Sequence, residues 1–243
     1  MQPFMKFINL LFFMLMVIMN YLANALPLGG KTTGALSAQY PNLFVPAGIT
    51  FSIWGVIYLL LGIFVILQFR EQQRPLVEVI GWAFVLSCLF NALWIVAWHN
   101  ESLVLSFLIM LGLLATLVYI NIQLKALPFG IIRAAFGIYL GWICIATIAN
   151  LTALLVQYNW GGWGLADSTW AMAMILAGLL VTSYALYAVK NPFLGLAVIW
   201  AFAGIVINRQ DDYPAIAATA WVAIGLMTLV TIWGFWNFRQ LHI

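Results

Sequence analysis

Residues 102–124 read SLVLSFLIMLGLLATLVYINIQL, and this stretch contains no Asp, Glu, Lys or Arg. A surface helix of a soluble protein carries charged residues on its outer face. About 20 apolar residues in an α-helix are instead what is needed to cross the hydrocarbon core of a bilayer. The uninterrupted run therefore predicts a transmembrane helix.

Similar apolar runs fill the rest of the chain. Its 243 residues are 66% hydrophobic and 6% charged, and its mean hydropathy is +1.08. Because a soluble domain has about 25% charged residues, the composition predicts an all-α fold, a polytopic transmembrane bundle of about eight helices. The helices are predicted at residues 7–26, 45–69, 76–98, 102–124, 129–157, 168–189, 192–207 and 214–238. The range 192–207 falls just short of the usual length of a span.

The basic residues are divided unequally between the two sides of such a bundle. Cytoplasmic loops are enriched in Lys and Arg, and one side of the bundle receives only Lys31 and Arg209. The other side receives Lys6, Arg70, Arg74, Lys125, Arg133, Lys190 and Arg239. Both termini are therefore predicted to be cytoplasmic, in a multi-pass protein of a bacterial or archaeal plasma membrane.

The first predicted helix has a second interpretation. Lys6, the apolar run and Ala23-Asn24-Ala25 before Pro27 also fit a secretory signal peptide with a small-residue cleavage site. The length of the apolar run favours a retained helix. Residues 1–25 are therefore expected to be a retained span, with a cleaved signal peptide as the alternative.

Charged residues near the bilayer centre would indicate an ion-coupled pump or a retinal protein, and the predicted spans place none there. Glu78 and Arg133 lie close to helix ends, where long side chains reach the headgroups. Asp167 is predicted to be the N-cap of the helix that follows it. Arg209, with Asp211 and Asp212 in the same loop, is predicted to be solvated.

Other classes of protein are also disfavoured. The basic residues are scattered, whereas a nucleic-acid surface needs them clustered, so no nucleic-acid partner is expected. Cys88 and Cys144 sit in apolar runs without the spacing of a metal or haem site, and His99 stands alone. No metal site and no cofactor are therefore predicted. No positioned nucleophile or acid–base pair stands out either, so no conventional catalysis is expected.

Tryptophan is the unusual feature of the composition, with twelve in the chain. Trp54, Trp142 and Trp200 lie several turns inside their helices, where a buried indole N–H needs a hydrogen-bond partner. The candidate partners within the spans are Ser52, Asn91, Thr147 and Asn150. Two interpretations are open, namely helix packing with hydrogen bonds, or an aromatic pocket for a large apolar ligand.

Small residues predict a close helix contact. Gly137-Ile-Tyr-Leu-Gly141 is a GxxxG motif, which lets two helix backbones approach closely. The motif fits packing within one chain as well as a homodimer. The sequence alone leaves intramolecular packing and a homodimer both open.

Three blocks on successive helices together resemble a known family. They are Pro46 followed by Phe51-Ser-Ile-Trp54-Gly-Val-Ile-Tyr58, then Asn91-Ala-Leu-Trp94, then Tyr139-Leu-Gly-Trp142-Ile-Cys-Ile-Ala146-Thr147-Ile-Ala-Asn150. The chain resembles the TspO/MBR family, the tryptophan-rich sensory proteins related to the mitochondrial translocator protein. The resemblance covers about residues 5–160, so 1–160 is predicted to be a TspO-like five-helix unit and 161–243 an additional three-helix transmembrane extension.

The resemblance implies a five-helix bundle, usually a homodimer, with a pocket near the loop between the first two helices. The family's ligands are porphyrins and other tetrapyrroles, with sterols in mitochondrial members, and its proposed roles are sensing, transport and light-dependent porphyrin breakdown. Flat macrocycles stack on indole and phenol rings, while Asn and Thr can meet a propionate or a ring nitrogen. The ligand-binding residues implied by the resemblance are Trp54, Tyr58, Asn91, Trp94, Tyr139, Trp142, Ala146, Thr147 and Asn150.

The chain also departs from the family pattern. The loop Gln39-Tyr-Pro-Asn-Leu-Phe-Val-Pro46 lacks the family's lid tryptophan, so Phe44 or Tyr40 would have to replace it. Ile138 stands where the family has proline. No Arg or Lys follows Asn150 directly, so the sterol-contact pattern of mitochondrial members is missing.

The leading hypothesis is a membrane protein that binds, senses or transports a tetrapyrrole or a similar flat hydrophobic ligand in a Trp-lined pocket. The hydrophobic partner is expected to be porphyrin-like, with a lipid as the other possibility. Photochemical breakdown of a bound porphyrin is the one enzymatic role left open. The alternative function is a non-catalytic accessory or assembly subunit that binds other membrane helices. Under either hypothesis the protein is expected to contact the lipid bilayer. A homodimer formed through the GxxxG motif is the possible protein partner.

Overall fold

A computed structural model of the protein describes residues 4–25 and 30–239, and within these ranges every regular element is helical. The α-helices are α1 (Met5–Ala25), α2 (Thr33–Ala38), α3 (Ile53–Leu67), α4 (Arg74–His99), α5 (Leu103–Gln123), α6 (Ile131–Gln157), α7 (Asp167–Val189), α8 (Phe193–Arg209) and α9 (Pro214–Arg239). A 3₁₀ turn, Gly48–Ser52, leads directly into α3. The predicted all-α transmembrane bundle is confirmed.

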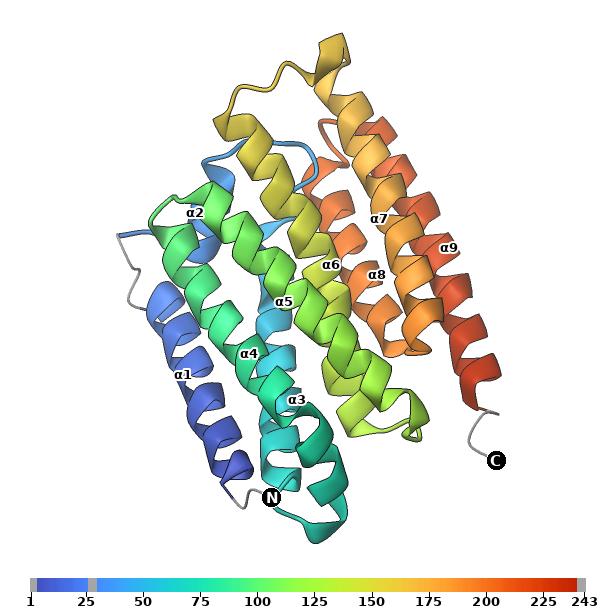
Figure 1. Ribbon diagram of the computed structural model, residues 1–243. Helices are drawn as coiled ribbons and strands as arrows, with labels where there is room; N and C mark the ends of the chain where they lie inside the picture. Colours follow the sequence, from blue (N-terminus) through green and yellow to red (C-terminus); the bar gives the residue numbers. More distant parts are fainter. Residues whose placement is uncertain (1–3, 26–29, 240–243) are drawn as a thin grey trace.

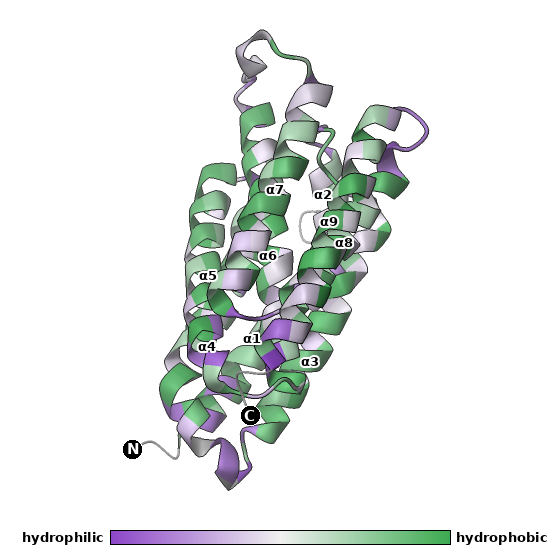
Figure 2. Ribbon diagram, turned by 90° about the vertical axis from the view of Figure 1, so that its right-hand side faces the viewer, coloured by the Kyte–Doolittle hydropathy of each residue, from purple (hydrophilic) through white to green (hydrophobic). Residues whose placement is uncertain are grey.

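Each of the eight predicted helices has a counterpart in the structure. Seven of the helices in the described ranges are long and apolar enough to cross a membrane. The shorter apolar helix is α8, with 17 residues, which matches the shortest predicted range. Figure 2 shows that the helix surfaces are mostly hydrophobic and that hydrophilic residues gather at the turns.

The bundle places α1, α3, α4 and α5 on one side and α7 and α9 on the other, with α6 and α8 between them (Figure 1). The helix α1 begins and α9 ends at the lower end of the bundle in Figure 1. The upper end carries α2, the α4–α5 turn, the α6–α7 loop and the α8–α9 turn. The predicted cytoplasmic residues belong to the lower end, but the side of the membrane that this end faces stays a prediction.

The helix α1 is part of the polar interior of the bundle. Asn9 donates to the Gln68 side chain at the end of α3, at 2.9 Å, and Asn20 donates to Asn91 of α4, at 2.7 Å. Both asparagines are buried. Residues 1–3, where the predicted N-terminal segment starts, lie outside the described residues, as do 26–29.

The short helix α2 was not expected from the sequence. Its N-cap is Thr32, whose hydroxyl oxygen accepts the N–H of Ala35 at 3.1 Å and so satisfies one of the free donors of the first turn. The helix has six residues and only one buried large apolar side chain, Leu36. It therefore lacks the long apolar run by which the other helices were found.

The GxxxG motif is used within the chain. Gly137 faces Asn191, and a Cβ at Gly141 would overlap the carbonyl oxygen of Leu194 and lie 3.1 Å from the Cβ of Ala197. These partners belong to α8 and to the turn before it. The α6 backbone thus packs directly on α8, and the motif's two open interpretations narrow to intramolecular packing.

Two charged residues behave differently from the prediction. Arg133 does not extend toward the headgroups, because it is only 1% exposed and donates to the carbonyl oxygens of Leu127, at 3.0 Å, and of Lys190. Carbonyls at helix ends lack partners within their own helix, and they hold the guanidinium inside the bundle. Asp167 is not an N-cap either: Ala166 occupies that position, and Asp167 is the first residue of α7, where its charge meets the helix dipole.

Candidate functional site

Aromatic side chains from α3, α4 and α6 surround Trp54. The Trp54 ring stacks on Tyr58, with the centroids 5.5 Å apart, and meets Tyr139 and Trp142 edge to face at 5.9 and 6.2 Å. The Trp94 ring is tilted against it, with the centroids 6.5 Å apart. The sequence-predicted aromatic residues are therefore brought together, and they pack mainly on one another.

The side chains predicted to accept hydrogen bonds from the indole N–H groups do not accept them in the structure. The Nε1 atoms of Trp94 and Trp142 are buried and have no hydrogen-bond acceptor in the described part of the chain. Trp200 is 40% exposed, so it is not a buried residue, and it donates to the backbone carbonyl of Thr50 at 2.8 Å, not to a side chain. A buried donor without a partner costs about 1–3 kcal/mol, so the two unpaired indoles mark a place where an acceptor would be stabilising.

Asn91 instead belongs to a network of side-chain hydrogen bonds that runs beside Trp54. Asn20 of α1 donates to the Oδ1 of Asn91 at 2.7 Å, and the Nδ2 of Asn91 donates to the hydroxyl of Tyr139 at 2.9 Å. All three residues are buried. This hydrogen-bond network links α1, α4 and α6 and fixes the position of the Tyr139 ring against Trp54.

The other predicted residues lie further along α6. The hydroxyl of Thr147 donates to the carbonyl of Ile143 in its own helix at 2.7 Å. Asn150 donates to the hydroxyl of Ser106 on α5 at 2.9 Å. Ala146 packs partly buried against the core. Among the nine predicted residues only Trp54 lines the pocket described next, so the role of the other eight in binding stays a prediction.

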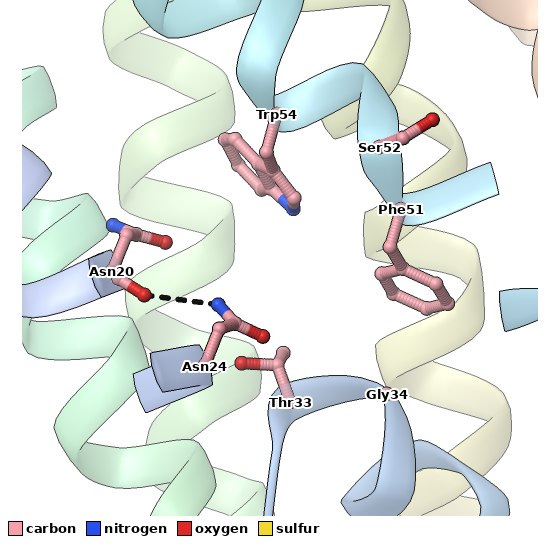
Figure 3. A pocket seen from close by; sticks show the side chains of 7 residues that line it. All are labelled: Asn20, Asn24, Thr33, Gly34, Phe51, Ser52 and Trp54. Carbon is pink, nitrogen blue, oxygen red and sulfur yellow. Dashed lines mark hydrogen bonds between the residues drawn. The ribbon is translucent and has the colours of Figure 1, made fainter. Parts of the chain in front are cut away.

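The inner pocket is a cavity of about 260 Å³ between α1, α2 and the start of α3. Its lining residues are Asn20, Asn24, Thr33, Gly34, Phe51, Ser52 and Trp54. Figure 3 shows the rings of Trp54 and Phe51 facing Asn24 and Thr33 across the space. The Thr33 hydroxyl is buried and has no hydrogen-bond partner in the described residues. The pocket thus offers two aromatic faces together with amide and hydroxyl groups.

The outer cavity, of about 810 Å³, adjoins the inner pocket. Both cavities are lined by Gly34 and Phe51, so these residues form the boundary between them. The other walls of the outer cavity are most of the loop between Ser37 and Gly48, although not Phe44, together with the start of α7 at Asp167 and the end of α8 with Arg209. The C-terminal helices therefore contribute to the cavity that continues the inner pocket.

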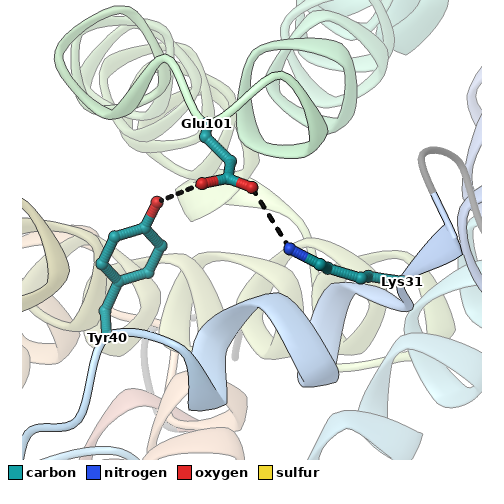
Figure 4. A network of polar contacts seen from close by, with 3 residues as sticks. All are labelled: Lys31, Tyr40 and Glu101. Atoms are coloured by element: carbon teal, nitrogen blue, oxygen red, sulfur yellow. Dashed lines mark hydrogen bonds and ion pairs between the residues drawn. The ribbon is translucent and has the colours of Figure 1, made fainter.

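One carboxylate holds both ends of α2 over these cavities. Glu101, in the α4–α5 turn, accepts a hydrogen bond from the Tyr40 hydroxyl at 3.2 Å and pairs with the Nζ of Lys31 at 3.4 Å (Figure 4). Burial first, and then the bond and charge of Glu101, raise the pKa of Tyr40. The phenol is therefore protonated at neutral pH and donates to the carboxylate.

Arg209 at the end of α8 holds the other side of the same loop. Its Nε donates to the carbonyl of Leu43 at 3.1 Å and its Nη2 to the carbonyl of Asn42 at 2.9 Å. The neighbouring Asn208 donates to the carbonyl of Val45 at 2.9 Å. The prediction that Arg209 is merely solvated is therefore wrong, because backbone carbonyls of a distant loop satisfy its donors.

Of the two residues predicted to replace the lid tryptophan, Tyr40 meets the tryptophan-rich cluster from the loop side, because its ring centroid lies 6.2 Å from that of Trp98. Phe44 is buried against the core. Phe51 also meets the cluster: it lies edge to face on Trp142, with the centroids 5.8 Å apart, and lines the inner pocket. The replacement of the lid tryptophan stays a prediction.

Sequence reasoning missed Asn20 and Asn24. Their spacing of four places them on one face of an apolar helix, and this spacing is a signal that could have found them.

Comparison with known proteins gives one match. The family described as TSPO-like protein matches residues 6–233. The match begins within α1 and extends through α7 and α8 into α9, so it covers more of the chain than the three sequence blocks do. No curated protein and no solved structure matches the chain at a significant level.

Proposed function

The chain belongs to the family of TSPO-like proteins, and from this premise we propose that it binds a flat, largely apolar ring ligand of the tetrapyrrole class. The ligand lies in the inner pocket and the outer cavity. The observation that carries the proposal is the inner pocket, where the rings of Trp54 and Phe51 face Asn24 and Thr33 and the Thr33 hydroxyl is buried and has no partner among the described residues. The protein is an integral multi-pass membrane protein, as its long apolar helices indicate.

The volumes suggest how such a ligand would be divided between the cavities. Small-molecule sites are typically about 300–1,000 Å³, and the inner pocket, at about 260 Å³, lies just below that range. The outer cavity, at about 810 Å³, has room for a macrocycle. One edge of the ring would therefore reach past Phe51 to Trp54, while the rest of the ligand remained in the outer cavity.

The chemistry of the lining residues fits this arrangement. Indole and phenyl faces favour offset or edge-to-face contact with a flat π-system, and Trp54 and Phe51 provide them. Asn24 and Thr33 present amide and hydroxyl groups to the same space, and these can donate to a carboxylate or a ring nitrogen. We propose that the biological role is reversible binding for sensing or transport, with no chemical step.

Fluorescence of the protein's own tryptophans tests the proposal. The purified protein is titrated with protoporphyrin IX in the dark, with free tryptophan used to correct for absorption by the ligand. Saturable quenching at micromolar ligand is expected. The affinity should fall in Trp54→Phe and Trp142→Phe, and should be unchanged in the matched control Trp221→Phe, whose ring is 60% exposed on α9.

A different result would exclude this function. Linear, unsaturable quenching that none of the substitutions alters would show that the pocket does not take the family's ligand. The accessory-subunit hypothesis would then be the better one, and purification of the protein with its neighbours from native membranes would test it directly.

A further inference from the structure

A third cavity opens between the ends of α6 and α7. This side pocket, of about 270 Å³, has apolar walls that include Leu155 and Val156 of α6 and Met174 of α7. Trp160 and Trp170 also line it, with their ring centroids 4.9 Å apart. Tryptophans favour the boundary between headgroups and hydrocarbon. The side pocket therefore suits a molecule that approaches from the apolar part of the bilayer.

The side pocket and the outer cavity lie on two sides of one short segment. Both are lined by Pro41, Asn42 and Leu43, and both reach Asp167. The outer cavity in turn meets the inner pocket at Gly34 and Phe51. The three cavities therefore follow one another from the α6–α7 opening to Trp54, and residues 41–43 are the partition between the first and the second.

The partition is held mainly through its backbone. The guanidinium of Arg209 binds the carbonyls of Asn42 and Leu43, and both bonds reach across from α8. The Asn42 side chain bonds within the segment, to the carbonyl of Tyr40 and the N–H of Phe44. If Arg209 is removed, these local bonds remain, but the tie between the segment and α8 at residues 42 and 43 is lost.

We propose that the three cavities form one path from the bilayer to the Trp54 pocket, that the side pocket is its mouth, and that Arg209 is the latch on the partition at residues 41–43. The path takes an amphipathic molecule with a flat apolar ring system. The ring crosses the side pocket beside Trp160 and Trp170, and a polar end of the molecule meets polar side chains of the outer cavity, which include Ser37 and Asn208. The identity of the ligand rests on the function proposed above, whereas the path rests on the cavities alone.

The rates at which a ligand of the proposed class binds and dissociates test the path. In lipid nanodiscs, stopped-flow quenching by protoporphyrin IX should show association and dissociation both about tenfold faster in Arg209→Met, because two charge-assisted hydrogen bonds no longer hold the partition closed. Arg209 also lines the outer cavity, so the diagnostic result is the faster association, which the loss of a ligand contact alone would not produce. Arg209→Lys, which keeps a cation able to reach one carbonyl, should give intermediate rates.

A second substitution narrows the mouth without touching the latch. Thr152→Phe adds bulk to the α6 wall of the side pocket and should slow both rates. The matched control is Leu180→Phe on α7, at a side chain that is 70% exposed and lines none of the three cavities, and it should leave both rates unchanged. Circular dichroism of each variant confirms that the helical bundle is intact.

A chemical probe tests the path independently of porphyrin. Cys88 and Cys144, the buried native cysteines, are replaced with Ala, and Thr33→Cys then places a thiol in the inner pocket. Pyrene maleimide, a flat apolar reagent that partitions into the bilayer, should label this thiol faster with Arg209→Met and more slowly with Thr152→Phe.

The two experiments separate the path from the proposed function. If porphyrin does not bind but labelling follows this order, the function is wrong and the path stands. If porphyrin binds saturably while neither its rates nor the labelling respond to Arg209→Met or Thr152→Phe, the path is overturned and the function stands.

Discussion

A single methyl group added at Gly141 tests the contact that joins α6 to α8. A Cβ at this position would overlap the carbonyl oxygen of Leu194 and lie 3.0 Å from its carbonyl carbon. The obstacle is backbone, so no side-chain rotation can relieve it. Gly141→Ala therefore requires the two helices to move apart.

The expected magnitude follows from two opposing effects. Overpacking in a tight core costs about 1–3 kcal/mol, whereas replacing a helical Gly with Ala gains about 1 kcal/mol in helix propensity. The difference of these values is about 0–2 kcal/mol. Because the obstacle is backbone, the net change in the free energy of unfolding should be a loss near the upper end, about 2 kcal/mol. The matched control is Gly225→Ala in α9, because a Cβ there has no atom within 4 Å. It should be neutral or stabilising.

The assay is reversible unfolding in mixed micelles of dodecyl maltoside and sodium dodecyl sulfate, followed by tryptophan fluorescence and circular dichroism. The opposite signs of the two substitutions are the decisive observation. If Gly141→Ala were as stable as the wild type, or if the two alanine variants changed stability alike, the close α6–α8 contact would be refuted. Light scattering of the same samples would show whether Gly141→Ala changes the mass of the particle.

Three further substitutions probe other contacts. Asn191→Leu removes the donor that serves Asn121 at 2.8 Å and the carbonyl of Arg133 at 2.9 Å, and should lower the free energy of unfolding by about 1–3 kcal/mol; a wild-type value would contradict this. Tyr40→Phe should be destabilising by an amount that is constant below pH about 10, the pKa of an unfolded tyrosine, and that shrinks as the pH rises through the raised pKa of Tyr40. A difference that grew above pH about 10 would overturn the sign of the linkage. Trp200→Phe removes the donor to Thr50 and should lower the unfolding temperature by about 2–4 °C, whereas exposed Trp236→Phe should not.

The long helices could be predicted from the sequence because a bilayer requires an apolar run of at least about 17 residues in each span. The range 102–124 and helix α5, Leu103–Gln123, agree to within one residue at each end. The helix α2 could not be predicted in this way. It lies in a loop, has no apolar run, and is stabilised by an N-cap and by Glu101 from a distant turn.

The aromatic cluster was predicted in part. The sequence blocks bring Trp54, Tyr139 and Trp142 into contact as the family resemblance implies. The inner pocket, however, lies at the edge of this cluster, because its other wall is made by Asn24 and Thr33. Such a wall depends on how a loop folds back onto the bundle, and residue types alone do not reveal it.

The side chain of Arg209 shows why charge in a loop is difficult to interpret. In the sequence it has two aspartates close by, at 211 and 212, and this grouping is typical of solvated charge. In the structure its hydrogen bonds go to carbonyls of residues 42 and 43. Backbone acceptors carry no sequence signature, so a contact of this kind cannot be found before the chain is folded.

The distance in sequence between Arg209 and the carbonyls that it binds has a consequence for the synthesis of the protein. Arg209 and Asn42 are 167 residues apart, and a ribosome adds about 5–20 residues each second. At that rate about 10–30 s pass between the synthesis of the loop at residues 41–43 and that of Arg209, which holds it on α8. In the last part of this interval, between the synthesis of α6 and that of α8, the glycine face of α6 is also uncovered. The nascent chain therefore exposes both surfaces until α8 has been synthesised.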